Sequence, residues 1–93
     1  VDMSHGNSQK QFKKQLIVNK DISDQIASGD QSIFGVMIES NLEEGNQKID
    51  SLKNLKYGQS VTDACVNWKD TEVMLRLLAK AVDARKEKLK RSA

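Results

Sequence analysis

The sequence has 93 residues, of which 38% are hydrophobic and 30% are charged, and its formal net charge is +2. This length allows one small domain, and the charge is too small to indicate a nucleic acid or an anionic membrane surface as a partner. The single cysteine, Cys65, excludes an internal disulfide and is typical of a reducing compartment. Without a signal-peptide core or an apolar run near the roughly 20 residues that span a bilayer, we expect a soluble, cytoplasmic protein.

The first predicted helix covers residues 8–28. Ser8 and Gln11 have the spacing of a capping box, in which each side chain bonds a free backbone donor of the first turn. Gly29 can take the left-handed conformation that ends a helix. Apolar side chains recur between these ends with helical spacing, at Phe12, Leu16, Ile22 and Ile26. The four residues before it, VDMS, are interpreted as the end of a strand.

The predicted helix is followed by an uninterrupted apolar run at residues 33–38, IFGVMI. Such a run predicts a strand buried on both faces, as in parallel sheets. Residues 40–69 lack clear periodicity, and loops this long are usually functional or disordered. Asp70 is the expected cap of a final helix. Its apolar stripe is predicted at Met74, Leu77, Leu78, Ala81 and Ala84 or Arg85.

The predicted order of elements is βαβα, which indicates an α/β fold with a parallel sheet and right-handed crossovers. Two βα units cannot close a sheet or cover both of its edges. Unpaired strand edges invite pairing with another chain. We therefore expect the chain to associate with more sheet, either as part of something larger or as a homo-oligomer.

Three ionisable side chains occupy equivalent places in this order. His5 follows the first strand, Glu39 follows the apolar strand, and Asp63 lies in the loop before the last helix. Ligand sites of α/β folds form beyond the C-terminal ends of parallel strands, so His5 and Glu39 could converge. One imidazole with two carboxylates suits a divalent cation such as Mn, Fe, Co or Zn.

Each of these residues, taken singly, is also typical of an ordinary structural role. A lone histidine in a polar segment and a glutamate after a strand are most often solvated, and Asp63 suits a turn. Cys65 is expected to be a small buried apolar residue, and Trp68 to pack under the start of the last helix. The acidic pair that follows the strand, Glu43 and Glu44, is interpreted as solvated loop charge.

Three longer segments go beyond this pattern: VDMSHGNSQKQF, GVMIESNLEEGNQ and YGQSVTDACVNW. In their residues and in their order along the chain, these segments resemble the C-terminal portion of class I 3-deoxy-D-arabino-heptulosonate 7-phosphate (DAHP) synthases of the aromatic-amino-acid-sensitive type. The family patterns are D-x-S-H-[AG]-N-S, G-V-M-[IV]-E-S-x-[LI]-x-E-G-N-Q and S-[IV]-T-D-A-C-I-G-W. The resemblance covers essentially the whole chain. One departure is Asn67, which stands where the family usually has Gly.

The resemblance implies a fold and an activity. These enzymes are (β/α)8 TIM barrels that condense phosphoenolpyruvate with erythrose 4-phosphate, the entry step of the shikimate pathway. The chain would supply the end of the seventh strand, the seventh helix, the eighth strand, the long loop and the eighth helix. A divalent metal is held in the family by Cys, His, Glu and Asp, of which the last three map to His5, Glu39 and Asp63. The cysteine lies on an earlier strand, and Cys65 is not its equivalent.

The resemblance also limits what the chain is expected to do by itself. A complete barrel needs on the order of 250 residues, and the family's phosphate-binding Arg and Lys lie mostly on earlier strands. We therefore expect the 93-residue chain to be inactive alone, with Asp63 a proton acceptor in the complete enzyme. The alternatives are a non-catalytic metal-binding or self-associating domain derived from the barrel, and a related 3-deoxy-octulosonate type of synthase.

Overall fold

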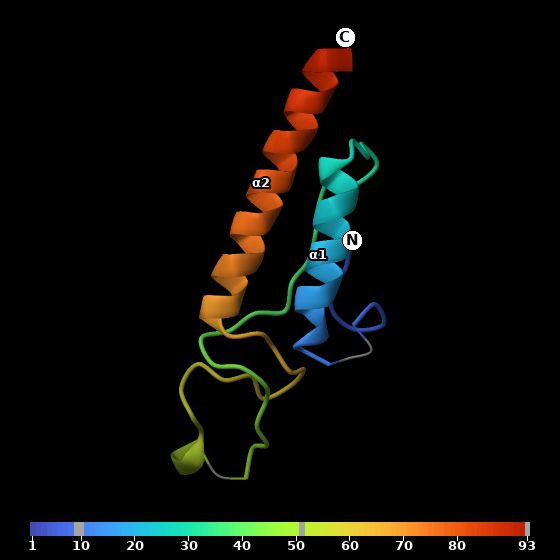
Figure 1. Ribbon diagram of the computed structural model, residues 1–93. Coiled ribbons are helices and arrows are strands. Elements are labelled where there is room, and N and C mark those ends of the chain that lie inside the picture. The colour runs from blue at the N-terminus through green and yellow to red at the C-terminus, as the bar shows by residue number, and fades with distance from the viewer. Residues whose placement is uncertain (9–10, 51, 93) are drawn as a thin grey trace.

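The computed structural model describes residues 1–8, 11–50 and 52–92. Over these residues the regular elements are the α-helices α1 (Lys14–Ala27) and α2 (Trp68–Ser92), with a short 3-10 helix, η1 (Leu52–Asn54), in the loop between them. Figure 1 shows α1 and α2 side by side and running in the same direction, with α2 continuing well beyond the end of α1. This parallel arrangement is the one that two successive βα units produce.

The start of α1 differs from the predicted start at Ser8. The helix begins at Lys14, after turns at residues 11–13, and its N-cap residue Lys13 makes no side-chain capping bond. The Ser8 hydroxyl donates instead to the backbone carbonyl of His5, at 3.4 Å. The predicted capping box was therefore wrong, because Ser8 belongs to the turn that holds His5. Of the predicted helical residues, 9 and 10 lie outside the described part of the chain.

The end of α1 confirms the predicted helix stop at Gly29. This glycine has a φ of 109°, in the left-handed region where a side chain would be strained. Its N–H donates to Ile26 O at 3.0 Å, and the N–H of Asp30 donates to Gln25 O at 3.2 Å. These two bonds form a Schellman motif, which satisfies carbonyls that the helix end leaves free.

The hydrophobic core lies between the two helices and the segments that precede them. Ile22 and Ile26 of α1 are one turn apart, and Met74, Leu78 and Ala81 of α2 face them with helical spacing. The remaining buried members come from outside the helices: Met3, Ile33 and Val66. The predicted stripe of the last helix is thus confirmed at Met74, Leu78 and Ala81, whereas Leu77 is half-buried.

Arg85 completes the stripe in place of Ala84, which is exposed. Its Nη1 donates to the carbonyls of Asp30 and Ile33, each at 2.8 Å. The guanidinium therefore satisfies two backbone acceptors of the segment that follows α1. This contact ties the second half of α2 to the start of the apolar strand segment.

The first residues and the apolar run pair in parallel, as predicted, but through an isolated bridge between Asp2 and Met37, and the predicted regular strands do not form in the described residues. Met37 N–H donates to Val1 O at 2.8 Å, and Met3 N–H donates to Met37 O at 2.9 Å. The prediction that residues 33–38 are buried on both faces was wrong, since Phe34 is 97% exposed while Ile33 is 8% exposed. Val36 and Met37 are also 37% and 42% exposed, whereas Ile38 packs against the core to which Ile33 belongs.

The long connection predicted after the apolar run is confirmed, because η1 is the sole helix in the described residues between 40 and 67. The predicted cap Asp70 was wrong. The Asn67 side-chain oxygen accepts the N–H of Asp70 at 2.8 Å, so Asn67 caps α2 and Asp70 lies in its first turn. Trp68 begins the helix and is 54% exposed, so its predicted packing under α2 was also wrong. In the described part of the chain, no helix has the length and apolar character to cross a membrane.

Candidate metal centre

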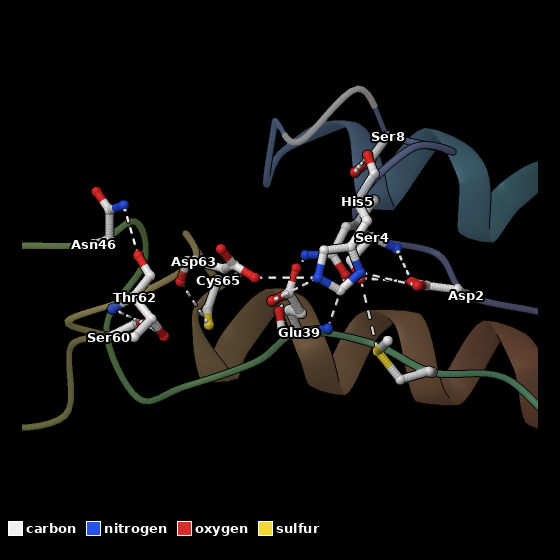
Figure 2. A network of polar contacts seen from close by, with 12 residues as sticks. Asp2, Ser4, His5, Ser8, Glu39, Asn46, Ser60, Thr62, Asp63 and Cys65 are labelled. Carbon is white, nitrogen blue, oxygen red and sulfur yellow. Dashed lines mark hydrogen bonds and ion pairs between the residues drawn. The ribbon is translucent and has the colours of Figure 1, made fainter.

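His5, Glu39 and Asp63 meet at one place, although they come from three separate segments of the chain. His5 Nε2 lies 3.1 Å from Asp63 Oδ2 and 3.6 Å from Glu39 Oε2. One donor atom from each of the three residues lies within 4.8 Å of the other two. Figure 2 shows the imidazole of His5 between the carboxylate of Asp63 on one side and that of Asp2 on the other. The predicted convergence of His5 and Glu39 is thus observed, and Asp63 lies with them.

His5 sits in a tight turn that follows the parallel pairing of the first residues. Its backbone φ is 50°, in the left-handed region that non-glycine residues seldom occupy. Such strain persists where the surroundings fix it, and it often marks a functional position. Here the ring is held from behind, because His5 Nδ1 lies 2.9 Å from Asp2 Oδ2 and 2.9 Å from Ser4 Oγ.

Glu39 is fixed through its backbone by α1. The side chain of Gln15 is 1% exposed. Its Oε1 accepts the N–H of Glu39 at 3.0 Å, and its Nε2 donates to the Glu39 carbonyl at 3.1 Å. The same carbonyl also accepts the N–H of Val66 at 3.0 Å. Because both backbone polar groups of Glu39 are hydrogen-bonded, the position from which its side chain projects is fixed.

Asp63 is carried by the loop and is the most exposed of the three, with 63% of its side chain accessible. The loop is pinned nearby by two backbone hydrogen bonds between Gly45 and Cys65, at 2.8 and 3.1 Å. Asn46 Nδ2 also donates to the carbonyl of Thr62 at 2.9 Å. These contacts bring Asp63 over His5 without burying its carboxylate.

The electrostatics of the site favour a cation. Hydrogen bonds from Ser4 and then from His5 lower the pKa of Asp2 to about 2. Hydrogen bonds to Asp2 and then to Asp63 raise the pKa of His5, whereas burial raises that of Glu39. Three carboxyl groups therefore surround one imidazole, and a positive charge held among them would be stabilised.

The donor set also has the chemistry and spacing of a metal site. Two ligands bound about 2.0–2.2 Å from one cation lie roughly 3.0–3.5 Å from each other. The separation of 3.1 Å between His5 Nε2 and Asp63 falls in this range, and that of 3.6 Å to Glu39 lies just above it. The three side chains line a cavity of about 210 Å³ together with Ser8, Phe12, Gln15 and Asn46. Imidazole nitrogen and carboxylate oxygen suit Mn, Fe, Co or Zn.

Two residues of this centre were not singled out by the sequence patterns. Asp2 lies in the predicted strand end, and Gln15 lies in the first helix. From the sequence alone, an isolated polar residue at either place is assigned to the solvent-exposed surface. The expectation for Cys65 is confirmed: it is 8% exposed, and burial raises the pKa of its thiol. Of the acidic pair, Glu43 is exposed beside Lys56 at 3.3 Å, whereas Glu44 accepts a hydrogen bond from Asn67 at 3.1 Å.

With this geometry established, comparison with known proteins identifies the family. The sequence model of the DAHP synthetase I family matches residues 1–76. The chain belongs to the DAHP synthetase I family. The DAHP synthase resemblance of its three motifs is thereby confirmed.

Several relatives within the DAHP synthetase I family are similar over most of this chain. It is 56% identical, over 86 residues, to the Phe-sensitive phospho-2-dehydro-3-deoxyheptonate aldolase of Escherichia coli K12, covering 92% of this chain and 25% of that protein. It is 59% identical, over 85 residues, to the Trp-sensitive enzyme of Salmonella typhi, covering 91% and 24%. These relatives confirm the aromatic-amino-acid-sensitive type.

A solved structure supports the same assignment. The phospho-2-dehydro-3-deoxyheptonate aldolase of Francisella tularensis superposes with a TM-score of 0.85 at 57% identity, covering 90% of this chain and 24% of that one. This DAHP synthetase I chain therefore spans about a quarter of the length of the relatives it matches.

Proposed function

We propose that this chain is the C-terminal part of a DAHP synthase barrel, and that its role is to supply three of the four ligands of a divalent metal. In this proposal residues 1–93 run from the end of the seventh strand to the eighth helix. The complete enzyme condenses phosphoenolpyruvate with erythrose 4-phosphate. The observation that carries the proposal is the convergence of His5, Glu39 and Asp63 within 4.8 Å, in a chain of this family.

The residues of the chain have separate tasks in this proposal. His5 and Glu39 are the better-anchored ligands, since Asp2 and Gln15 hold them from behind. When bound, a divalent cation supplies Lewis-acid polarisation of an aldehyde oxygen or an activated water. Asp63 is exposed on the open side of the cavity, where its carboxylate can also accept a proton. Overall, C3 of phosphoenolpyruvate bonds to the aldehyde carbon, water adds at C2, and phosphate leaves.

Titration of the metal-free chain with Mn²⁺ tests the ligand assignment. Glu39→Gln and His5→Ala should each weaken the affinity at least tenfold, because each removes a direct ligand. Glu43→Gln is the matched control, since this nearby exposed carboxylate pairs with Lys56 rather than with the site. If the ligand substitutions leave Mn²⁺ affinity unchanged, or if Mn²⁺ does not bind, the proposed site is wrong.

We also propose that the 93-residue chain is inactive alone. A catalytic protein needs cations that bind both substrate phosphates, and the resemblance places these outside the chain. Incubation with both substrates and Mn²⁺ should give no DAHP above a blank that lacks protein. Turnover that is lost on Glu39→Gln would overturn this expectation.

The second candidate function is a metal-binding or self-associating module without catalysis. The exposed apolar side chains of the run at residues 33–38 favour it, since Phe34, Val36 and Met37 are 97%, 37% and 42% accessible. The two candidates differ in what must accompany the chain. A catalytic part requires a further segment with phosphate-binding cations, whereas a module requires another apolar surface. Restored synthesis on mixing with a polypeptide that carries the remaining barrel would favour the first.

A further inference from the structure

Asp2 lies directly behind the proposed metal ligand His5 and is not itself one of the three ligands. Its Oδ2 is 2.9 Å from His5 Nδ1, while the opposite ring nitrogen, Nε2, points to Glu39 and Asp63. We propose that Asp2 is the positioning residue of the centre, which keeps the neutral His5 ring in the tautomer whose Nε2 lone pair is free for a cation. This inference rests on the proposed metal site.

The argument starts from the hydrogen-bonding capacity of the two groups. An ionised carboxylate can only accept, so the contact between Asp2 and Nδ1 requires the proton to be on Nδ1. A neutral imidazole carries one ring proton, and Nε2 is then an acceptor. Ser4 supports the same assignment, because its hydroxyl donates to Asp2 Oδ1 at 2.5 Å and its oxygen can accept from Nδ1 at 2.9 Å.

Asp2 is also anchored well enough to impose this choice. The backbone N–H of Ser4 donates to Asp2 Oδ1 at 2.8 Å, and Asn7 Nδ2 donates to the Asp2 carbonyl at 2.5 Å. Ser4 is 1% exposed, so this support does not depend on a mobile surface group. Asp63 competes for the ring proton from the other side, but it is 63% exposed and lies farther away, at 3.1 Å.

The substitution Asp2→Asn should reverse the tautomer. The Asp2 Oδ1 already accepts from both the N–H and the hydroxyl of Ser4. In the variant the amide oxygen takes this place, so its NH₂ group faces His5 Nδ1. Nδ1 must then accept, and the ring proton moves to Nε2, where it blocks the metal position. Asp30→Asn is the matched control, because the Asp30 carboxylate likewise accepts from the N–H and the hydroxyl of a serine two residues on, Ser32, but lies in the turn after α1.

Nitrogen NMR of the metal-free chain tests the tautomer directly, because the chain contains one histidine. At a pH above the titration of His5, the wild-type and Asp30→Asn chains should show the Nδ1–H form, and Asp2→Asn should show mainly Nε2–H. An Nε2–H ring in the wild-type chain would overturn the inference without reference to any variant. So would an Asp2→Asn chain that keeps the wild-type ring signals.

Mn²⁺ affinity provides the second measurement. Loss of a carboxylate behind a ligating histidine typically weakens metal binding about 10- to 100-fold, and we expect this for Asp2→Asn but not for Asp30→Asn. Equal Mn²⁺ affinity in the wild-type and Asp2→Asn chains would overturn the positioning role. If the wild-type chain binds no Mn²⁺, the proposed ligand set fails, and the tautomer of the metal-free ring still decides the role of Asp2.

Discussion

The carboxamide of Gln15, on helix α1, bonds to both backbone polar groups of Glu39. It accepts the Glu39 N–H at 3.0 Å and donates to the Glu39 carbonyl at 3.1 Å. A neighbouring β-strand would normally make this pair of bonds. A buried side chain of the helix thus replaces a strand at the residue whose carboxylate faces His5.

Replacing Gln15 should therefore affect both stability and the site. Gln15→Met keeps the size of the side chain but leaves the Glu39 N–H without its partner, which should cost about 1–3 kcal/mol of unfolding free energy. Mn²⁺ affinity should fall several-fold as Glu39 loses its fixed position. Urea unfolding and Mn²⁺ titration measure the two effects.

Asn19→Leu is the control for this pair of effects. Asn19 is also buried on α1, one turn beyond Gln15 on the same face, but its Nδ2 donates to the carbonyl of Met74 rather than to Glu39. The variant changes a buried polar contact without touching Glu39, so Mn²⁺ affinity should stay at the wild-type value. Equal affinities of Gln15→Met and Asn19→Leu would show that Gln15 has no influence on the metal position.

The pH dependence of stability should reveal the interaction of His5 with its carboxylates. The pKa of His5 is raised in the folded chain above its ordinary value of 6.5, so the folded state binds this proton more tightly. The resulting stabilisation is fully present below pH 6.5 and is lost as the pH rises through the raised value. Unfolding free energies of the metal-free chain across the neutral range should show this decline, and His5→Gln should remove it.

Asp2 gives the opposite dependence at acid pH. Its pKa is lowered from 3.8 to about 2, so its stabilising contribution is present above pH 3.8 and is lost as the pH falls toward 2. The Asp2→Asn variant should lose less stability than the wild-type chain over that interval. The same loss in both chains would argue against the short contacts of Asp2 with Ser4 and His5.

Cys65 should not bind the metal, although it lies next to the loop aspartate. Its thiol is buried, burial raises its pKa, and Sγ donates to the carbonyl of Asp63 at 3.5 Å. A protonated thiol is a poor metal ligand. The Co²⁺-loaded chain should show visible ligand-field bands without a thiolate-to-cobalt band in the near ultraviolet. A near-ultraviolet band that disappears in Cys65→Ser would contradict this.

The cap of α2 predicts a graded response to substitution at position 67. Asn67→Ala removes the bond to the Asp70 N–H and should cost about 0.5–2 kcal/mol, whereas Asn67→Gly should cost only a few tenths. Glycine is itself accepted at the N-cap position of helices, so it should be well tolerated. Thermal unfolding of the two variants gives the comparison. A glycine variant less stable than the alanine variant would disprove the capping role.

The exposed apolar side chains at residues 34–37 predict self-association of the 93-residue chain. Phe34 is 97% exposed, and Val36 and Met37 are 37% and 42% exposed. Sedimentation should show species larger than the 10.4 kDa monomer, and Phe34→Lys should shift the population toward that monomer. Ile17→Lys is the control, since Ile17 is a comparably exposed apolar residue on α1, at 69%. A stable wild-type monomer would rule this association out.

The sequence predicted the parts of the structure that depend on local chemistry or on simple topology. Gly29 ended α1 as expected, because its left-handed backbone is a local property. The meeting of His5 and Glu39 followed from the rule that parallel strands end at the same edge. The apolar run at residues 33–38 correctly predicted parallel pairing with the first residues. Its burial depends on the surrounding structure, so the prediction that Phe34 is buried was wrong.

The residues behind the ligands could not be predicted in the same way. Gln15 occurs where a helical pattern allows a solvated side chain, and only the position of the Glu39 backbone makes it a buried partner. Asp2 is acidic, yet nothing in its spacing indicates that it faces the rear of the His5 ring. Ser8 had the correct spacing for a capping box, but its hydroxyl donates to the backbone carbonyl of His5 instead. These roles depend on which residues lie nearby in the folded chain, and not on the spacing of residue types along the sequence.

Trp68 offers a practical consequence of the junction between the loop and α2. It is the single tryptophan of the chain, it is 54% exposed, and its backbone N–H donates to the carbonyl of Leu42 at 3.4 Å. Indole emission therefore comes from one position, at the point where the loop that carries Asp63 meets the helix. Any rearrangement of that loop on addition of a cation should change the wavelength or intensity of the emission, so the unlabelled chain carries its own fluorescent reporter.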